Sequence, residues 1–311
     1  MQTRRRAARP FKTALRLLVP LGAAMLLSAA APGPGAGVPR FAHWIDGTGA
    51  SEPETQVQRI DADTFVIRQS VRTNFEAPFL YLIFGKDRAL LLDSGAGGLT
   101  IRPAIDRVIG DWRKRHGGRP VHLIVAHSHS HGDHHAGDDE FRDRPDTEVV
   151  GLKPEQVAAF FRIRDWPNEI GHFDLGGRVL DVIPTPGHEP AHIMVYDART
   201  RLLFSGDMLY PGRLYVPLDH FADFRASADR LAAFAQTHPI RALLGAHIEM
   251  TTNAGQDYPM EAPTHPSEHP LPLSPAVIGE LDQAVAKAGP TPTIDRHADF
   301  IVYPRPVKPA P

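Results

Sequence analysis

Short apolar runs of the kind that form buried strands recur along most of the chain. These runs are residues 64–71, 79–84, 89–92, 121–126, 147–152, 178–184, 192–197, 201–205 and 242–245. Gly85-Lys86-Asp87-Arg88 separates two of them and predicts a hairpin turn. A last strand is expected within residues 293–303.

Segments between these runs have the spacing of amphipathic helices, and in the first of them Ile101, Ile105 and Val108 share one face. The predicted helices are residues 101–116, 153–164, 224–237 and 275–288. Strands followed by a helix, twice over, predict two sheets with helices outside them. Residues 249–273 are rich in Pro, Thr and His and are expected to form a surface excursion.

Composition narrows the class of protein. With 42% hydrophobic and 23% charged residues over 311 positions, the chain has the composition of a globular protein. The absence of cysteine excludes disulfides, a cysteine nucleophile, Cys-based zinc fingers and iron–sulfur clusters. Six of the 34 basic residues and none of the 36 acidic residues lie in residues 1–31, which leaves 28 basic and 36 acidic side chains beyond them. This acidic remainder disfavours nucleic acid as a partner.

Residues 1–31 have the pattern of a secretory signal peptide. A basic stretch precedes an apolar one from Leu17 to Ala31, and Ala29 and Ala31 fit a cleavage site between small residues. As a helix the apolar stretch would span about 22 Å, which is short of the roughly 30 Å hydrocarbon core of a bilayer. We therefore expect a periplasmic or secreted protein with no stable membrane anchor after cleavage.

The most distinctive segment follows the predicted strand 121–126. It reads His127-Ser128-His129-Ser130-His131-Gly132-Asp133-His134-His135. Imidazole and carboxylate are the ligands expected for zinc when cysteine is absent. A loop after a strand can aim alternate side chains at one point, so His129 and His131 would face one metal, and Asp133 and His134 a second. Histidine tracts also arise from composition alone, but the interspersed Gly and Asp and the preceding strand favour a metal site.

The spacing His129-x-His131-x-Asp133-His134 resembles the signature of the metallo-β-lactamase superfamily, and four further segments resemble its other motifs in order. These are Leu90-Leu91-Leu92-Asp93-Ser94-Gly95, Thr185-Pro186-Gly187-His188, Phe204-Ser205-Gly206-Asp207 and Leu244-Gly245-Ala246-His247. The resemblance covers residues 64–247. It implies an α/β fold of the four-layer αβ/βα type, with two mixed sheets flanked by helices and metals at the sheet edges.

The resemblance also implies a domain organisation. Residues 1–31 would be the signal peptide, 32–55 a linker and N-terminal extension, and 56–311 a single hydrolase domain. Within that domain the core would span about 64–250, and a C-terminal helix and strand would lie within 274–303.

Two divalent metal ions are the cofactors that the resemblance implies, with zinc as the default for His/Asp sites and iron or manganese also compatible. The implied ligands are His129, His131 and His188 for the first metal, and Asp133, His134 and His247 for the second. Asp207 would bridge the metals, as in the glyoxalase II-like and lactonase-like branch. Asp93 would orient the ligand loop from behind. Alone, Asp93, Asp207 or His247 could be an ordinary structural residue, and their order along the chain is what favours the metal site.

The implied activity is hydrolysis of an ester-like carbonyl bond in a small molecule, which would be a lactone, an ester or a thioester. A hydroxide shared by the two metals would attack the carbonyl, and Asp133 would hold it and shuttle its proton. Tyr210 resembles the carbonyl-contacting tyrosine of lactonases, so Asp133 and Tyr210 are the predicted catalytic residues. His192, Arg213 and Tyr215 are expected in or behind the pocket wall.

Two alternatives stay open at this point. A β-lactamase of the Cys-free type would lack a bridging aspartate, a position that Asp207 fills here. A non-catalytic periplasmic metal-binding protein would need ligands but no bridging water and no substrate pocket, and the presence of Asp133 and Asp207 favours an enzyme. A serine hydrolase and a nucleotide-binding protein are disfavoured, because the chain has no Gly-x-Ser-x-Gly elbow and no Gly-Lys-Ser/Thr after Gly95-Ala96-Gly97-Gly98.

Overall fold

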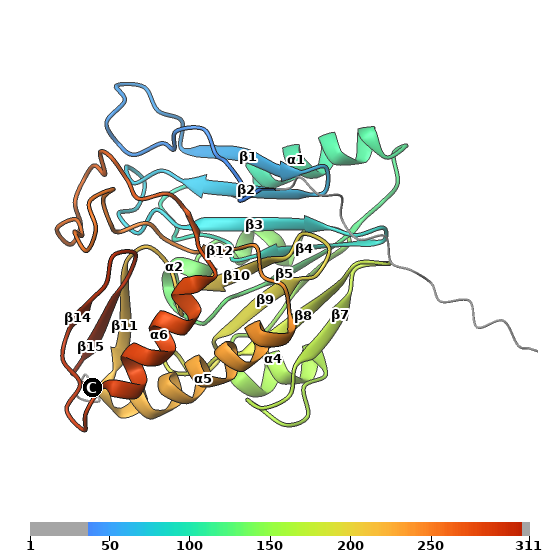
Figure 1. Cartoon of the computed structure of the whole chain (residues 1–311). Helices are drawn as coiled ribbons and strands as arrows, with labels where there is room; N and C mark the ends of the chain where they lie inside the picture. The colour runs from blue at the N-terminus through green and yellow to red at the C-terminus, as the bar shows by residue number, and fades with distance from the viewer. Residues whose placement is uncertain (1–36, 307–311) are drawn as a thin grey trace, which may run out of the picture. The chain divides into compact units, whose positions relative to one another are not determined.

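The first of two six-stranded sheets is built from the N-terminal half of residues 37–306, which are the residues that this computed structural model describes (Figure 1). Its strands, in spatial order, are β1 (Thr55–Asp61), β2 (Thr64–Gln69), β3 (Phe79–Phe84), β4 (Arg88–Leu92), β5 (His122–Ala126) and β6 (Thr147–Val149). Strands β1 to β4 pair antiparallel, whereas β4, β5 and β6 pair parallel because helices connect them. The connecting helices are α1 (Arg102–Arg115), α2 (Gly132–His135) and α3 (Asp139–Arg142).

The second six-stranded sheet follows α4 (Pro154–Phe161) along the chain. Its strands, in spatial order, are β13 (Pro272–Leu273), β12 (Ala242–Gly245), β10 (Leu202–Gly206), β9 (Ile193–Asp197), β8 (Val179–Pro184) and β7 (Gly171–Asp174). A third, three-stranded sheet has the order β11 (Arg213–Pro217), β15 (Ile301–Arg305) and β14 (Asp295–Arg296). The remaining elements are the 3₁₀ turn η1 (Leu218–His220) and helices α5 (Phe221–Thr237) and α6 (Ala276–Lys287).

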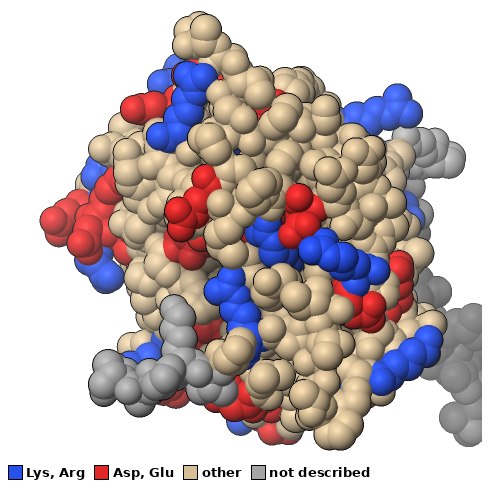
Figure 2. All heavy atoms as spheres, turned by 90° about the vertical axis from the view of Figure 1, so that its left-hand side faces the viewer, with Lys and Arg blue, Asp and Glu red and all other residues tan. Residues whose placement is uncertain are grey.

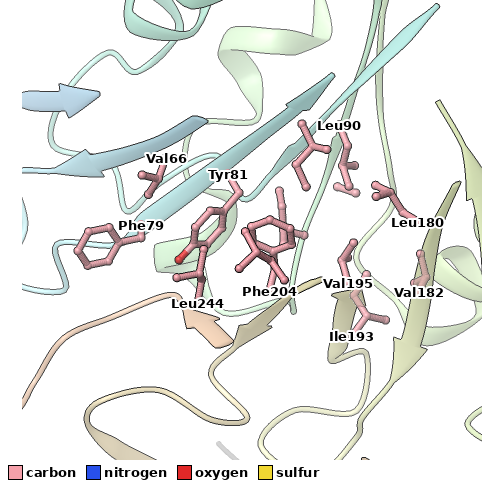
Figure 3. Close-up of a cluster of buried hydrophobic side chains, with 14 of the residues drawn as sticks. Val66, Phe79, Tyr81, Leu90, Leu180, Val182, Ile193, Val195, Phe204 and Leu244 are labelled. Carbon is pink, nitrogen blue, oxygen red and sulfur yellow. The ribbon is translucent and has the colours of Figure 1, made fainter. Parts of the chain in front are cut away.

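Apolar side chains between the two large sheets form the main core, which Figure 3 shows in close-up. Tyr81 of β3 packs on Phe204 of β10 with ring centroids 4.7 Å apart. The whole of β3 is buried, which explains why it reads as an unbroken apolar run rather than an alternating one. The Tyr81 hydroxyl donates to the carbonyl of Gly245 at 2.5 Å, so the core also holds the strand that precedes His247.

Helices cover the outer faces of both sheets. Ile105, Ile109 and Trp112 of α1 pack on the first sheet, and Phe224 and Leu231 of α5 pack on the second, with α6 beside α5. The order helix, sheet, sheet, helix confirms the predicted four-layer αβ/βα sandwich. The third sheet was not part of that prediction.

Two segments pack closely on the domain. In the predicted N-terminal extension, Trp44 and Ile45 are buried and the Trp44 ring packs edge-on against Phe79. Residues 249–273 are not a loose surface excursion: Met250 is fully buried, and the Glu268 carboxylate pairs with the buried guanidinium of Arg68. Apolar contact and a buried ion pair fix both segments on the domain.

Two expectations concern the chain's relation to a membrane. The predicted signal peptide, residues 1–31, lies outside the described residues, so that assignment stays a prediction. Within residues 37–306, the helices are all too short or too polar to cross a bilayer.

A buried arginine joins the two sheets at the end opposite the predicted metal ligands. The Arg178 guanidinium pairs with Asp197 at 2.6 Å and donates to the hydroxyl of Thr64 and the carbonyl of Phe84. These partners lie on β9, β2 and β3, so one side chain ties both sheets together. An arginine this deeply buried is tolerated because each contact is a charge-assisted or carbonyl hydrogen bond.

Candidate metal centre

The loops that carry the predicted ligands converge at one edge of the two large sheets. β4 and β5 run in parallel, and β8, β10 and β12 share one direction because β8 and β10 are both antiparallel to β9. Their carboxyl ends therefore lie together, which is where α/β sheets commonly bind ligands. The residues that follow these ends are Asp93, His127–His135, Thr185–His188, Asp207 and His247. The Ile193 N–H donates to the Ser128 carbonyl at 2.7 Å and closes the two edges on each other.

The first group of ligand atoms is a triangle of imidazole nitrogens from His129, His131 and His188. The Nδ1 atom of His131 lies 2.9 Å from Nε2 of His129 and 2.9 Å from Nε2 of His188, and the two Nε2 atoms are 3.2 Å apart. Ligand nitrogens around a tetrahedral zinc ion, each about 2.0–2.1 Å from it, are separated by about 3.3 Å. The triangle is therefore close to the size that one zinc ion requires.

The second group contains Asp133, His134 and His247. Nε2 of His134 lies 3.2 Å from Oδ2 of Asp133 and 3.3 Å from Nε2 of His247, and that His247 atom is 3.4 Å from the same Asp133 oxygen. His134 and His247 are buried, whereas Asp133 is half-buried and faces the pocket. These separations also fit a single metal ion.

Asp207 lies between the two groups and turns one carboxylate oxygen toward each. Its Oδ2 is 3.6 Å from Nε2 of His188, and its Oδ1 is 3.4 Å from Nε2 of His247 and 3.6 Å from Nε2 of His134. Oδ1 is buried and has no hydrogen-bond donor. A buried carboxylate oxygen without a donor is costly unless a cation satisfies it. The donor set and this orphaned oxygen fit a pair of divalent metal ions with Asp207 between them.

Contacts behind the ligands fix which ring nitrogen faces the centre. Nδ1 of His188 lies 2.6 Å from the carbonyl of Tyr215, and Nδ1 of His247 lies 2.8 Å from the carbonyl of Glu76. A carbonyl only accepts, so each Nδ1 carries a proton and each Nε2 is the nitrogen that faces the centre. Nδ1 of His134 makes the same kind of contact with Oδ2 of Asp93, at 3.0 Å.

Asp93 also shapes the ligand loop. Its carboxylate accepts from the backbone N–H of Ser128 at 2.7 Å and from the Ser128 hydroxyl at 3.0 Å. It adopts a left-handed φ of 69°, a conformation that aspartate tolerates better than most residues. Asp93 thus holds both the start of the ligand loop and the ring of His134.

Close packing around Asp207 requires glycine before it. Gly206 has φ +50°, and a Cβ there would lie 2.7 Å from Nε2 of His192 and 2.8 Å from Cβ of Ser128. His192 accepts the backbone N–H of Asp207 at that nitrogen, and its other ring nitrogen contacts the hydroxyl of Thr185 at 2.8 Å. His192 therefore supports Asp207 from behind and is not a ligand.

Charges in the centre shift the pKa values of its members. Burial opposes the charge on His247, but Asp207 and Asp133 outweigh it and raise the pKa of His247 to about 10. Burial lowers the pKa of His188 to about 4, with Asp207 acting in the opposite direction. Burial alone would raise the pKa of Asp207, yet His247 and His134 hold that pKa well below its ordinary value. Protons on histidine balance the carboxylates, so a metal that binds here must release protons.

A cavity of about 720 Å³ opens onto the centre. His131, Asp133, His188, Asp207 and His247 all contribute to its lining, so each metal group has access to it. Parts of its wall come from the third sheet and from residues 258–261. The volume suits a small organic molecule.

Tyr210 and Arg213 line this cavity, as predicted for pocket residues, but their polar groups are engaged elsewhere. The Tyr210 hydroxyl donates its one proton to the carbonyl of Arg213 at 2.6 Å and lies 3.1 Å from Glu249. The Arg213 guanidinium is bound by Glu249 and Asp257. The geometry thus differs from the expected donation by Tyr210 to a substrate carbonyl, since a phenol has no second proton to give.

Several residues of the site act through contacts that the sequence does not predict. Glu249 holds Tyr210 and Arg213, and Ser128 connects Asp93 to the ligand loop. Glu76 and Tyr215 act on ligand histidines through backbone carbonyls, which no side-chain motif can reveal. Only Glu249 offered a hint, as an acid two residues after a predicted ligand.

Comparison with known proteins agrees with this fold. A family model described as the metallo-β-lactamase superfamily matches residues 74–272, which is more than half of the chain. The chain therefore belongs to the metallo-β-lactamase superfamily.

Relatives within this superfamily include hydrolases. The hydroxyacylglutathione hydrolase of Rhizobium meliloti (strain 1021) is 31% identical over 144 residues, which are 44% of this chain and 54% of the relative. The acyl-coenzyme A thioesterase MBLAC2 of Gallus gallus is 26% identical over 207 residues, 55% of this chain and 72% of the relative. The chain thus spans about half the length of the first of these proteins. Among solved structures, TMB-1 has a TM-score of 0.50 at 14% identity, over 76% of this chain and 99% of TMB-1, a likeness of fold alone.

Replacing Asp93 with alanine tests the support behind the ligands. Loss of its contacts to Ser128 and His134 is expected to weaken zinc binding about 10- to 100-fold, because such partners hold a ligand ring in place. Competition with a chromophoric chelator measures the affinity. Asp139→Ala, which removes an exposed carboxylate near the same loop, serves as the control. Unchanged affinity in Asp93→Ala would show that the ligand loop holds its shape without this residue.

Tyr210→Phe separates a structural hydroxyl from a catalytic one. Since the hydroxyl bonds within the protein, we expect full metal content and hydrolysis of the best substrate within a few-fold of the wild type. The free energy of unfolding should fall by about 1 kcal/mol for the lost hydrogen bond. Rate assays and urea denaturation measure these effects. A rate loss of about 10²–10³ would instead assign Tyr210 the role of a donor to the reacting carbonyl.

Proposed function

We propose that this protein is a metal-dependent hydrolase with a dinuclear centre, zinc being the expected metal, that cleaves an ester-like carbonyl bond in a small molecule. The observation that carries the proposal is the carboxylate of Asp207, which turns one oxygen to each of two ligand groups. A protein that only binds a cation needs one group of ligands. It does not need a second group of ligands that faces the same open cavity.

The roles of the ligands follow from their contacts. His129, His131 and His188 would hold the first ion, and Asp133, His134 and His247 the second, with Asp207 between them. Two such ions supply a nucleophile from water at neutral pH and polarise the carbonyl that it attacks. Asp133 is the half-buried carboxylate that faces the cavity, so it is suited to orient that water and to take up its proton.

The names of the relatives favour thioesters as the first substrates to test. One relative is a hydrolase of hydroxyacylglutathione and another is an acyl-coenzyme A thioesterase. Lactones and simple esters share the same reacting carbonyl and complete the panel. The fold alone does not decide among them, because one fold serves many substrates.

Metal content and turnover, measured together, test this function. We expect about two metal ions per chain and hydrolysis of at least one thioester, ester or lactone. His131→Ala should lose metal from the first group and almost all activity, since this residue supplies one corner of the nitrogen triangle.

His135→Ala is the matched control, because His135 ends the short helix that begins directly after His131 and belongs to neither ligand group. It should keep both metal and activity. Metal-loaded protein that hydrolyses no member of the panel would favour a metal-binding protein instead. A His131→Ala variant that keeps its metal and its activity would refute the ligand assignment.

Export is the second part of the proposal, and it depends on the signal-peptide pattern of residues 1–31 alone. The expected mature protein begins near Ala31 to Val38. Mass measurement of the N-terminus in the native host would test this, and an intact Met1 on a cytosolic protein would contradict it.

A further inference from the structure

Arg305 ends strand β15 and lines the cavity that opens onto the metal centre. Its guanidinium carbon lies 3.8 Å from the ring centroid of Tyr215 and 5.9 Å from that of Tyr303. Stacking on an aromatic ring fixes the plane of a guanidinium but uses few of its five N–H donors. Arg305 is thus held in place with its donors available.

The charge of Arg305 is unpaired among the described residues. Asp219 and Glu261 also line the cavity, yet neither they nor any other acid in residues 37–306 forms an ion pair with Arg305. Arg213, the other arginine of the cavity, is by contrast bound by Glu249 and Asp257. A fixed, unpaired guanidinium in a cavity is suited to bind an anionic group by charge-assisted hydrogen bonds.

Tyr215 connects this guanidinium to the metal centre. Its backbone carbonyl contacts Nδ1 of His188 at 2.6 Å, while its ring lies under Arg305. One residue therefore separates a predicted metal ligand from the unpaired cation. His188 and Arg305 also line the same cavity.

The cavity also has an apolar side. Phe75 and Met260 line it and remain 40% and 52% exposed, which places them among the few large hydrophobic residues left open to solvent. Figure 2 views the molecule from the side where β11, β15 and residues 249–273 lie in Figure 1, and charges of both signs are interspersed there among many uncharged residues. A cavity lined partly by exposed apolar side chains such as Phe75 and Met260 suits an organic molecule with an apolar part rather than a bare inorganic ion.

We propose that Arg305 is a specificity residue that binds the anionic group of an organic substrate whose reacting carbonyl lies at the metal centre. The substrate class is then an acyl compound that carries a carboxylate or a similar anion, with an apolar part against Phe75 and Met260. This inference rests on the proposed function, which identifies the reacting group of the substrate as a carbonyl. The negative charge of the substrate is inferred from Arg305.

Equilibrium binding tests the proposal without depending on turnover. Titration calorimetry of the zinc-loaded protein would compare phenylacetate, an organic anion, with phenylacetamide, its neutral analogue. Zinc contributes equally to ligand binding in the wild type and in the variants. A difference in affinity between them therefore reports on Arg305. In Arg305→Gln we expect phenylacetate to bind about tenfold more weakly, the usual effect of losing a charged hydrogen-bond partner, and phenylacetamide to bind as before.

Two further variants complete the design. Arg305→Lys keeps the positive charge and should retain the preference for phenylacetate. Arg115→Gln removes another arginine placed over an aromatic ring, that of Phe65, and should change neither affinity because Arg115 lies outside the cavity.

Three results would overturn the proposal. These are equal affinities for phenylacetate in the wild type and Arg305→Gln, no binding of phenylacetate to the wild type, and loss of zinc from Arg305→Gln, which would make the role structural. Failure of the proposed function gives a different result, namely normal Arg305-dependent binding of phenylacetate with no hydrolysis of any carbonyl substrate.

Discussion

The carboxylate of Asp207 is the group on which the rest of this site depends. It is buried, one of its oxygens has no donor, and its two oxygens turn toward two separate sets of ligand atoms. Five histidine rings crowd around it, with nitrogen atoms 2.9–3.3 Å apart. Lone pairs and charge held this close are unfavourable unless cations or protons lie between them. The arrangement is therefore best explained as a receptor for metal ions.

The fold supplies the rigidity that this crowding requires. The ligands follow four strands, β5, β8, β10 and β12, whose carboxyl ends meet, and the core behind those strands is closely packed, as with Tyr81 on Phe204. Asp93 and His192 add hydrogen bonds directly behind the ligands. Positions of metal ligands are most precise when rigid strands and such supporting bonds fix them. Arg178 holds the opposite end of the sheets together, so both ends of the sandwich are tied.

Strongly patterned features could be predicted from the sequence. The run 79–84 and the segment 242–245 predict strands with the observed bounds, because buried strands read as apolar runs. The spacing of histidine and aspartate after residue 126 predicts ligands that the structure brings within one cluster. In contrast, β11 and its partner β15 are about eighty residues apart along the chain, and no local pattern reveals such a pairing. The environment of Tyr210 was beyond prediction for the same reason, since Glu249 reaches it across the fold. Backbone carbonyls such as that of Glu76 leave no trace in side-chain spacing.

We propose that two metal ions lie on either side of Asp207. Anomalous diffraction from crystals of the zinc-loaded protein, collected at the zinc absorption edge, measures this directly. We expect two peaks, one within the triangle of His129, His131 and His188 and one beside Asp133, His134 and His247. Each peak should lie about 2.0–2.2 Å from a carboxylate oxygen of Asp207. A single peak, or two peaks with the Asp207 carboxylate turned away from both, would contradict this proposal.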